Sequence, residues 1–260
     1  MRFAYSTNRG AVRAENQDSL CLAEEVITGD MASADIGGSD DIPMLLAVID
    51  GMGGYGGGEL ASRILAETFA LASSRKIFAS SGDPVSDERK LLDILNEASS
   101  LMADAAKTED SHARMGATVA GILVREQYAL AFNCGDCRTY RMSCGVLERL
   151  TRDHSFVQSL FENGKIDEDG MRKHPKKNVV TSAVSANPPE KPELYARAIS
   201  RVAEDEYFIC SDGVWEALSV SELEGYLGGG FPDSARMLGE ALIARGCRDN
   251  VSFIWAASLF

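Results

Sequence analysis

The sequence predicts one α+β domain built from layers of helices and sheets. A length of 260 residues lies at the upper size of a single domain and can bury a substantial core. The composition, with 45% hydrophobic and 25% charged residues, is that of an ordinary globular protein. Segments with strand and helix patterns come in groups rather than in strict alternation, which favours α+β layers over a doubly wound parallel sheet.

Short apolar runs bounded by turn residues indicate six strands. They are Ser19 to Val26, Met44 to Ile49, Thr118 to Val124, Tyr128 to Asn133, Tyr207 to Cys210 and Val251 to Ala256. Several are apolar on both faces, which is typical of sheets that are covered on both sides by helices or by another sheet. A stretch rich in Gly, Ser, Asp and Ala, from Gly29 to Asp41, predicts an exposed loop between the first two strands.

Helical spacing of apolar residues predicts two long helices and one near the end of the chain. The first stripe is Leu60, Ile64, Leu65 and Phe69, and the second is Leu91, Leu95, Ala98, Met102 and Ala105. The last helix is expected to begin at Pro232, a residue favoured in the first turn, and to end near Gly246, which suits a left-handed cap.

Charge and composition exclude several classes of protein. The net charge of −13 and the isoelectric point near 4.7 argue against nucleic-acid binding, which needs clustered Lys and Arg. The start of the chain lacks an apolar signal segment, and no stretch approaches the roughly 20 apolar residues that span a bilayer, so we expect a cytoplasmic protein without a membrane span. The six scattered cysteines indicate reduced thiols, and Cys134 and Cys137 are expected to be turn residues rather than a redox or zinc site.

Five aspartates stand where predicted strands begin or end. These are Asp18, Asp50, Asp136, Asp212 and Asp249. If the strand ends meet at one edge of the sheets, the carboxylates lie close together and need divalent cations to remain ionised. Ligands that are all oxygen favour Mg²⁺ or Mn²⁺ over zinc, and Gly51 lets its carbonyl approach such an ion. Any single Asp–Gly pair taken alone is better explained as a turn, and only the five sites together favour a metal site.

Longer motifs resemble those of the metal-dependent protein serine/threonine phosphatases, the type 2C family. Eight of them follow one another in order: Arg13 to Asp18, Asp50 to Gly54, Gly116 to Val119, Asn133 to Arg138, Leu150 to Ser155, His174 to Val179, Cys210 to Trp215 and Arg248 to Val251. The resemblance covers essentially residues 1–260, which it identifies as a single phosphatase domain of the bacterial type. It implies a four-layer α-β-β-α sandwich with two central antiparallel sheets.

The resemblance also implies roles for the site residues and a reaction. Asp50 would bridge two Mn²⁺ or Mg²⁺ ions, with the Gly51 carbonyl on one ion, and Asp212 and Asp249 on the other. Asp18 would orient water in the outer shell, Asp136 and Asp212 can hold a third ion, and Arg13 would bind the substrate phosphate. A guanidinium suits that role because it donates paired hydrogen bonds and stays charged. The implied reaction is hydrolysis of phosphoserine or phosphothreonine by a water that two ions activate.

The implied partners are phosphoprotein substrates, among them a serine/threonine kinase or its targets. Residues from about 155 to 185 resemble the mobile flap that bacterial members carry beside the active site. His154 and His174 belong to no dyad or metal motif and are expected to be structural.

Three positions depart from the pattern of the family. Asn8 stands where many relatives have aspartate, and Gln17 replaces a glutamate common in eukaryotic members. Met52 stands where those members carry a histidine proposed to protonate the leaving alcohol, so the proton donor is unassigned.

Two other functions are open to the sequence. Gly51, Gly53 and Gly56 match the dinucleotide-binding fingerprint, although Asp50 would place a negative charge beside the pyrophosphate. An inactive relative that binds phosphoproteins would not need every metal carboxylate. A serine hydrolase and a zinc protease are excluded, since their motifs are missing.

Overall fold

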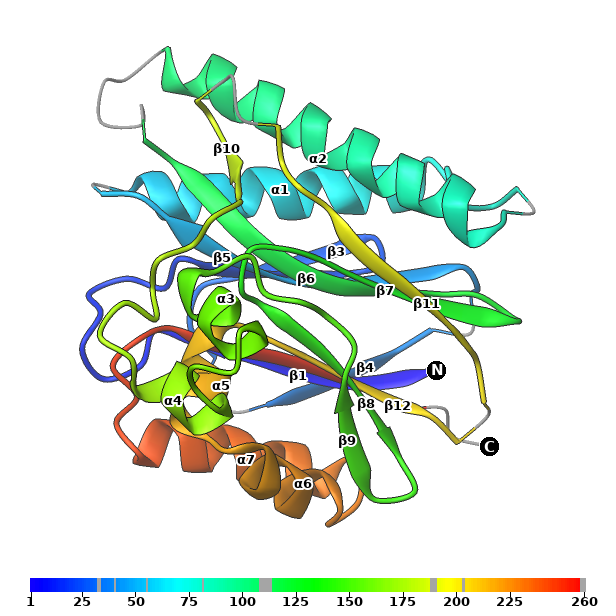
Figure 1. The fold of residues 1–260 in the computed structure, drawn as a ribbon. Coiled ribbons are helices and arrows are strands. Elements are labelled where there is room, and N and C mark those ends of the chain that lie inside the picture. The colour runs from blue at the N-terminus through cyan, green and yellow to red at the C-terminus, as the bar shows by residue number, and fades with distance from the viewer. Residues whose placement is uncertain are drawn as a thin grey trace.

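The computed structural model describes residues 1–31, 34–39, 41–54, 56–80, 82–107, 114–187, 191–202 and 204–257. Two antiparallel sheets pack face to face, with α1 (Gly57–Ser74) and α2 (Pro84–Ala106) covering one outer face (Figure 1). Helices α5 (Asp212–Ala217), α6 (Val220–Leu227) and α7 (Asp233–Ala244) cover the other. The predicted α+β class and the four-layer α-β-β-α sandwich are therefore confirmed.

The first sheet has the strand order β4-β1-β13-β12-β8-β9 and the second β11-β7-β6-β5-β2-β3, with β10 added beside β6. The strands of the first sheet are β1 Arg2–Asn8, β4 Asp35–Gly38, β8 Arg138–Ser143, β9 Val146–Arg149, β12 Glu206–Cys210 and β13 Val251–Ala257. Those of the second are β2 Asp18–Leu22, β3 Glu25–Thr28, β5 Met44–Met52, β6 Gly116–Val124, β7 Tyr128–Cys134, β10 Val184–Ser185 and β11 Tyr195–Ser200.

Three apolar cores fill the spaces between the four layers. Leu46, Ile122 and Ile254 belong to the core between the two sheets, whereas Phe69 and Phe132 belong to the core beneath α1 and α2. All nine residues of β6 are buried, as expected of a strand that is covered on both faces. The apolar runs on both faces in the sequence thus reflect a sheet between a helical layer and a second sheet.

One predicted strand and one predicted loop are wrong. The segment Ser19 to Val26 is not one strand but the hairpin of β2 and β3, because the chain turns at Ala23, which has a φ of 59°. The predicted loop Gly29 to Asp41 contains β4, which pairs with β1 at the edge of the first sheet. Residues 32, 33 and 40 of that loop lie outside the described residues.

The predicted helices are present, and α1 and α2 extend beyond both ends of their apolar stripes. Asp83 caps α2 by accepting hydrogen bonds from the backbone N–H groups of Val85 and Ser86, and Pro84 occupies the first turn. Helix α7 begins at Asp233, one residue after the predicted Pro232, and Gly246 follows its end with a φ of 67°. No helix in the described ranges is long and apolar enough to cross a membrane.

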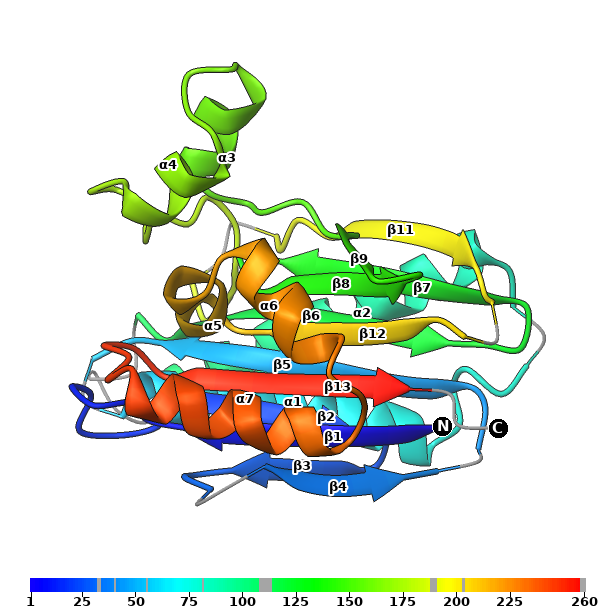
Figure 2. The same ribbon diagram turned by 90° about the horizontal axis from the view of Figure 1, so that it is seen from below.

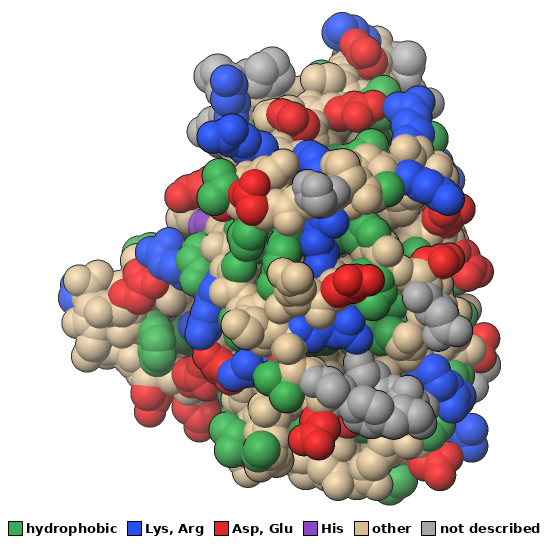
Figure 3. Space-filling view, turned by 90° about the vertical axis from the view of Figure 1, so that its right-hand side faces the viewer, with side chains coloured by type: hydrophobic (Ala, Val, Ile, Leu, Met, Phe, Trp, Pro, Cys, Tyr) green, Lys and Arg blue, Asp and Glu red, His purple; other side chains and the backbone are tan. Residues whose placement is uncertain are grey.

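The predicted flap contains two short helices, α3 (Phe156–Glu162) and α4 (Glu168–Lys173). Figure 2 shows both standing away from the two sheets. Acidic and basic side chains are intermingled on the face in Figure 3, without one continuous basic surface.

Candidate metal centre

The strand ends bring most of the predicted site residues to one cleft. Asp18 pairs with Asp50 where β2 and β5 lie side by side, and Asp212 begins α5 directly after β12. A cavity of about 240 Å³ is lined by Arg13, Gln17, Asp50, Gly51, Met52, Gly53, Thr118, Asp136, Asn178, Val180, Asp212, Asp249 and Asn250. Every predicted site residue except Asp18 lines this cavity, and Asp18 is buried beside Asp50.

The carboxylates raise one another's pKa values. Burial raises the pKa of Asp50 well above its usual range, and the charges of Asp18, Asp212, Asp136 and Asp249 add to the effect. The pKa of Asp212 is also raised, first by burial and then by the charges of Asp136 and further carboxylates. Burial also raises the pKa of Asp18 to about 6 and that of Asp136 to about 7. A cation bound in this cluster would offset the repulsion and let the carboxylates remain ionised.

Asp249 is held by Arg13, the one arginine among the described residues that line this cleft. Arg13 donates from Nε to Oδ1 of Asp249 over 2.8 Å and from Nη2 to Oδ2 over 2.6 Å. The Arg13 side chain remains 51% exposed and lines the cavity. One guanidinium therefore contacts both a candidate metal ligand and the space above it.

The absence of a side chain at Gly51 is required by packing. A Cβ atom there would lie 2.0 Å from the carbonyl oxygen of Gly58 and 2.6 Å from that of Gln17. The Gly51 N–H also donates to the Gln17 carbonyl over 3.1 Å. Close approach of α1 to the end of β5 thus explains this glycine without reference to an ion.

The donor set fits a hard divalent cation. Oδ2 of Asp18 accepts from the Ser211 hydroxyl over 3.0 Å, whereas Oδ1 is buried without a hydrogen-bond partner among the described residues. The side chains around it offer oxygen atoms, which Mg²⁺ and Mn²⁺ prefer. Within the part of the chain that the structure describes, no three His, Cys, Asp or Glu side chains already stand in an arrangement that would hold an ion.

A sequence profile described as Protein phosphatase 2C matches residues 30–238. The chain belongs to this family. The matched range contains Asp50, Asp136 and Asp212, whereas Arg13, Asp18 and Asp249 lie outside it.

Two similar proteins in this family come from bacteria. The chain is 30% identical to the serine/threonine protein phosphatase PstP of Mycobacterium tuberculosis over 266 residues, which cover 98% of this chain and 45% of PstP. It thus spans about half the length of that relative. It is also 30% identical to the serine/threonine phosphatase stp of Listeria monocytogenes, over 87% of this chain and 83% of stp.

A solved structure extends the similarity to the fold. The catalytic domain of a serine/threonine protein phosphatase PstP, in complex with two manganese ions, superposes with a TM-score of 0.76 at 27% identity. The superposition covers 99% of this chain and 99% of that chain.

The β5 strand of this phosphatase 2C chain is antiparallel to both of its neighbours. Gly51, Gly53 and Gly56 therefore do not belong to a dinucleotide-binding β-α-β unit, which needs parallel strands.

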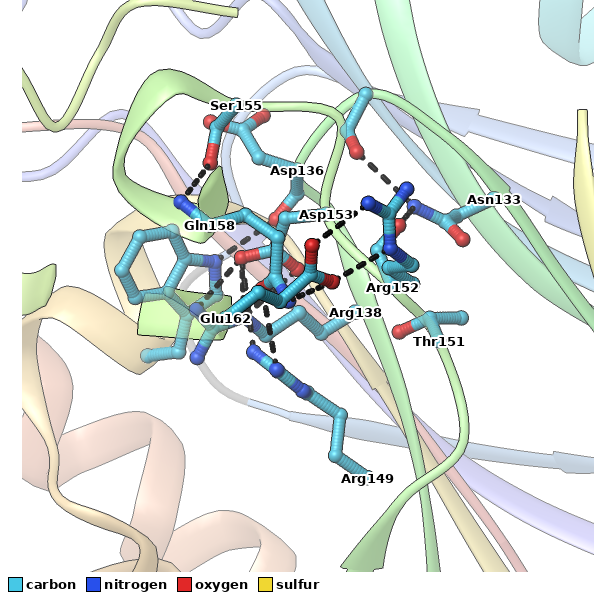
Figure 4. A network of polar contacts seen from close by, with 12 residues as sticks. Asn133, Asp136, Arg138, Arg149, Thr151, Arg152, Asp153, Ser155, Gln158 and Glu162 are labelled. Atoms are coloured by element: carbon cyan, nitrogen blue, oxygen red, sulfur yellow. Dashed lines mark hydrogen bonds and ion pairs between the residues drawn. The ribbon is translucent and has the colours of Figure 1, made fainter. Parts of the chain in front are cut away.

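A buried polar network connects the turn that carries Asp136 to the base of the flap (Figure 4). The Trp215 indole on α5 donates to the Asp136 carbonyl over 3.0 Å. The Arg138 guanidinium lies 3.7 Å from the centre of the Trp215 ring and makes a buried ion pair of 2.7 Å with Asp153. The network thus connects the Asp136 turn, the Asp212 helix and Asp153, which lies just before the predicted flap.

Glu216 was not among the predicted site residues. It lies four residues after Asp212 on α5, so both carboxylates project from one side of the helix. Lys177 of the flap segment makes an ion pair with Glu216 Oε2, and Oε1 is buried without a hydrogen-bond partner among the described residues. The charge of Glu216 raises the pKa values of Asp212 and Asp136 further. The i, i+4 spacing from Asp212 was the available signal.

The three unusual positions have different surroundings. Gln17 and Met52 line the cleft. Asn8 lies outside that lining, accepts from the Gly10 N–H over 2.9 Å and donates to the Met31 carbonyl over 3.3 Å. Asn8 therefore supports the loop that leads to Arg13.

His154 is a neutral side chain that contacts the turn carrying Asp136. It is 4% exposed, and its Nδ1 accepts from the Gly135 N–H over 3.1 Å. Burial lowers the pKa of His154 below its ordinary value. The unfolded chain therefore binds the proton more tightly than the folded protein does. The contribution of His154 to stability is fully present above the ordinary pKa of histidine and is lost as the pH falls below it.

His154→Asn should reduce the loss of stability in acid, because asparagine also offers an acceptor but does not titrate. Urea unfolding at pH 7.5, 6.5 and 5.5 should show that the parent loses more of its free energy of unfolding than the variant as the pH falls. His174→Asn is a matched control, since His174 also accepts a backbone N–H bond, from Lys176 over 3.1 Å, but is only half-buried. Equal pH dependence in parent and His154→Asn would refute this role.

Proposed function

We propose that this chain is a metal-dependent protein serine/threonine phosphatase. The observation that supports it best is the convergence of Asp50, Asp136, Asp212 and Asp249 on one cleft that Arg13 also lines. An anionic substrate would be repelled by these carboxylates unless cations reverse the local field. The relatives named as serine/threonine phosphatases, and the manganese ions in one of them, support the same function.

The residues of the cleft would hold two ions, and a third beside them. Asp50 would bridge the first two, with the Gly51 carbonyl on one, and Asp212 and Asp249 on the other. Asp136 and Asp212 would hold the third ion. Bound Mn²⁺ or Mg²⁺ would lower the pKa of water and polarise the phosphate ester. Asp249 would serve as a ligand only after its carboxylate turns partly away from Arg13.

The side chains of this chain would position the substrate and the water. Arg13 is exposed at the mouth of the cleft, and its free N–H donors can bind two oxygens of a phosphate. Asp18 is held by the Ser211 hydroxyl, which leaves Oδ1 to accept a hydrogen bond from water and orient it. A water oriented in this way would attack phosphorus in line, without a covalent intermediate on the protein.

We also propose a domain organisation, a class of partners and a cytoplasmic location. Residues 1–260 would form one phosphatase domain, with a flap at about residues 155–185. The substrates would be phosphoproteins, a serine/threonine kinase or its targets among them, and nucleic acid is disfavoured by the charge of −13. The six cysteines are free thiols, as expected in the reducing cytoplasm.

Phosphate release from three peptides tests the function. The peptides share one sequence and carry phosphothreonine, phosphoserine or phosphotyrosine at one position. With Mn²⁺ present, the first two should be hydrolysed and the third should not. Hydrolysis of phosphotyrosine alone, or of none of the peptides, would contradict the proposal.

A further inference from the structure

A second cavity lies directly beside the carboxylate cleft. Its volume is about 790 Å³, and Arg13, Asn178 and Asp249 line both cavities. Cavities of roughly 300–1,000 Å³ accommodate ligands larger than a phosphate group. We call the second cavity the side groove; its lining includes Arg13, Lys177, Glu216, Arg245, Arg248 and Asp249. A chain whose phosphorylated residue lies in the cleft would have room for its neighbouring residues here.

The side groove carries positive charge in an acidic protein. Among the described residues that line it, the cations Arg13, Lys177, Arg245 and Arg248 outnumber the two carboxylates, Glu216 and Asp249. The whole chain has a net charge of −13. Charge of one sign gathered in a cleft attracts ligands of the opposite sign and sets which partners bind.

Three of these cations already have carboxylate partners. Arg13 binds Asp249, Lys177 is paired with Glu216, and Arg245 donates to Glu222 over 2.6 Å. Arg248 is exposed and makes no hydrogen bond or ion pair with the residues that the structure describes. Its charge is therefore available to a ligand in the side groove.

The backbone of Arg248 is held in place on both sides. Cys247 and Asn250 are buried, and the Cys247 carbonyl accepts from the Ala11 N–H over 2.8 Å. The Asn250 side chain donates to the carbonyls of Arg9 over 3.1 Å and Glu15 over 3.0 Å. A fixed backbone lowers the entropy that Arg248 loses when it binds a ligand.

We propose that the side groove binds the substrate chain next to the phosphorylated residue, and that Arg248 selects an acidic side chain there. This inference rests on the proposed phosphatase function and adds a substrate class to it. A carboxylate on the substrate would pair with Arg248 at the partly exposed side of the groove. A lysine at the same place would meet the excess of cations and be disfavoured.

Peptide selectivity tests the assignment. Phosphothreonine peptides with three Glu, three Ala or three Lys residues, on the N-terminal or the C-terminal side, are compared by kcat/KM with saturating Mn²⁺. The parent should favour Glu over Lys on at least one side by about tenfold at low salt, and less as salt screens the contact. Arg248→Ala should lower this Glu/Lys ratio by about threefold and Arg248→Glu by about tenfold. Arg63→Glu, the same charge change on exposed α1, should leave the ratio unchanged.

The ratio separates selectivity from general damage, because a loss of metal or of folded protein lowers the rates for all peptides together. A parent that does not favour Glu over Lys on either side would overturn the inference while leaving the phosphatase function intact. So would a Glu/Lys ratio that Arg248→Glu leaves unaltered. If no phosphothreonine peptide were hydrolysed at all, the phosphatase function would fail and the selectivity with it.

Discussion

Asp50→Asn should lower the rate of phosphate release by about a thousandfold or more, because asparagine removes the charge that would bridge two cations. Asp50 is the carboxylate whose pKa is raised by all four of the others, Asp18, Asp212, Asp136 and Asp249. Asparagine has the same shape, so the packing of β5 against β2 and β6 is kept. The rate is measured on a phosphothreonine peptide at saturating Mn²⁺.

The stability of the same variant is the control for misfolding. The folded-state pKa of Asp50 is raised, so its ionisation at neutral pH favours the unfolded chain when no metal is bound. Asp50→Asn should therefore melt at the same or a higher temperature than the parent in the presence of a chelator. A variant that melts normally and keeps its activity within about tenfold would show that Asp50 does not have this role.

Arg13→Ala should lower kcat/KM by about a hundredfold, since it removes a guanidinium that can bind two phosphate oxygens at once. Arg13→Lys keeps the charge but not the paired geometry, and should recover about tenfold of this loss. Steady-state kinetics on the phosphothreonine peptide check both values.

Arg13 also holds Asp249, so a second measurement is needed to separate substrate binding from metal binding. Its bonds to Asp249 are 2.8 and 2.6 Å, and they compete with an ion for the same two oxygens. Arg13→Ala should therefore bind Mn²⁺ as tightly as the parent or more tightly in a calorimetric titration. Weaker Mn²⁺ binding that accounts for the whole loss of activity would refute the role in substrate binding.

The central strands and the long helices were predictable because their signals are local. The runs before Asp50 and Asp212 are apolar, and both residues lie where β5 and β12 end. The helical stripe from Leu60 to Phe69 likewise lies within α1. Buried elements repeat their pattern within a few residues, so a window of the sequence is sufficient to detect them.

Other elements depend on contacts that a window does not contain. Strand β1 was missed because it includes polar residues, yet Thr7 is buried and bonds to Ser252, which is distant in sequence. Strand β11 is a half-exposed edge strand without an apolar run. In the sequence, Asp87 looks like a surface residue of α2. In the structure it is fully buried against Arg125, which is distant in sequence.

The site shows the same division between local and distant signals. Individual Asp–Gly pairs do not reveal that Asp18 lies opposite Asp50, which is a matter of strand register. The ordered motifs of the family indicated this grouping, but they did not indicate the bond between Arg13 and Asp249 or the ion pair between Lys177 and Glu216. Both involve flexible side chains that meet only in the folded protein.

The most direct test of the metal-dependent function is a titration of Mn²⁺ into chelator-treated protein, with phosphate release from a phosphothreonine peptide as the signal. The parent should be inactive without the ion and should gain activity to a plateau as Mn²⁺ is added, whereas Asp50→Asn should stay inactive at every concentration. Full activity of the parent without any divalent ion, or the same titration curve for both proteins, would contradict the assignment of the aspartate cluster as a catalytic metal centre.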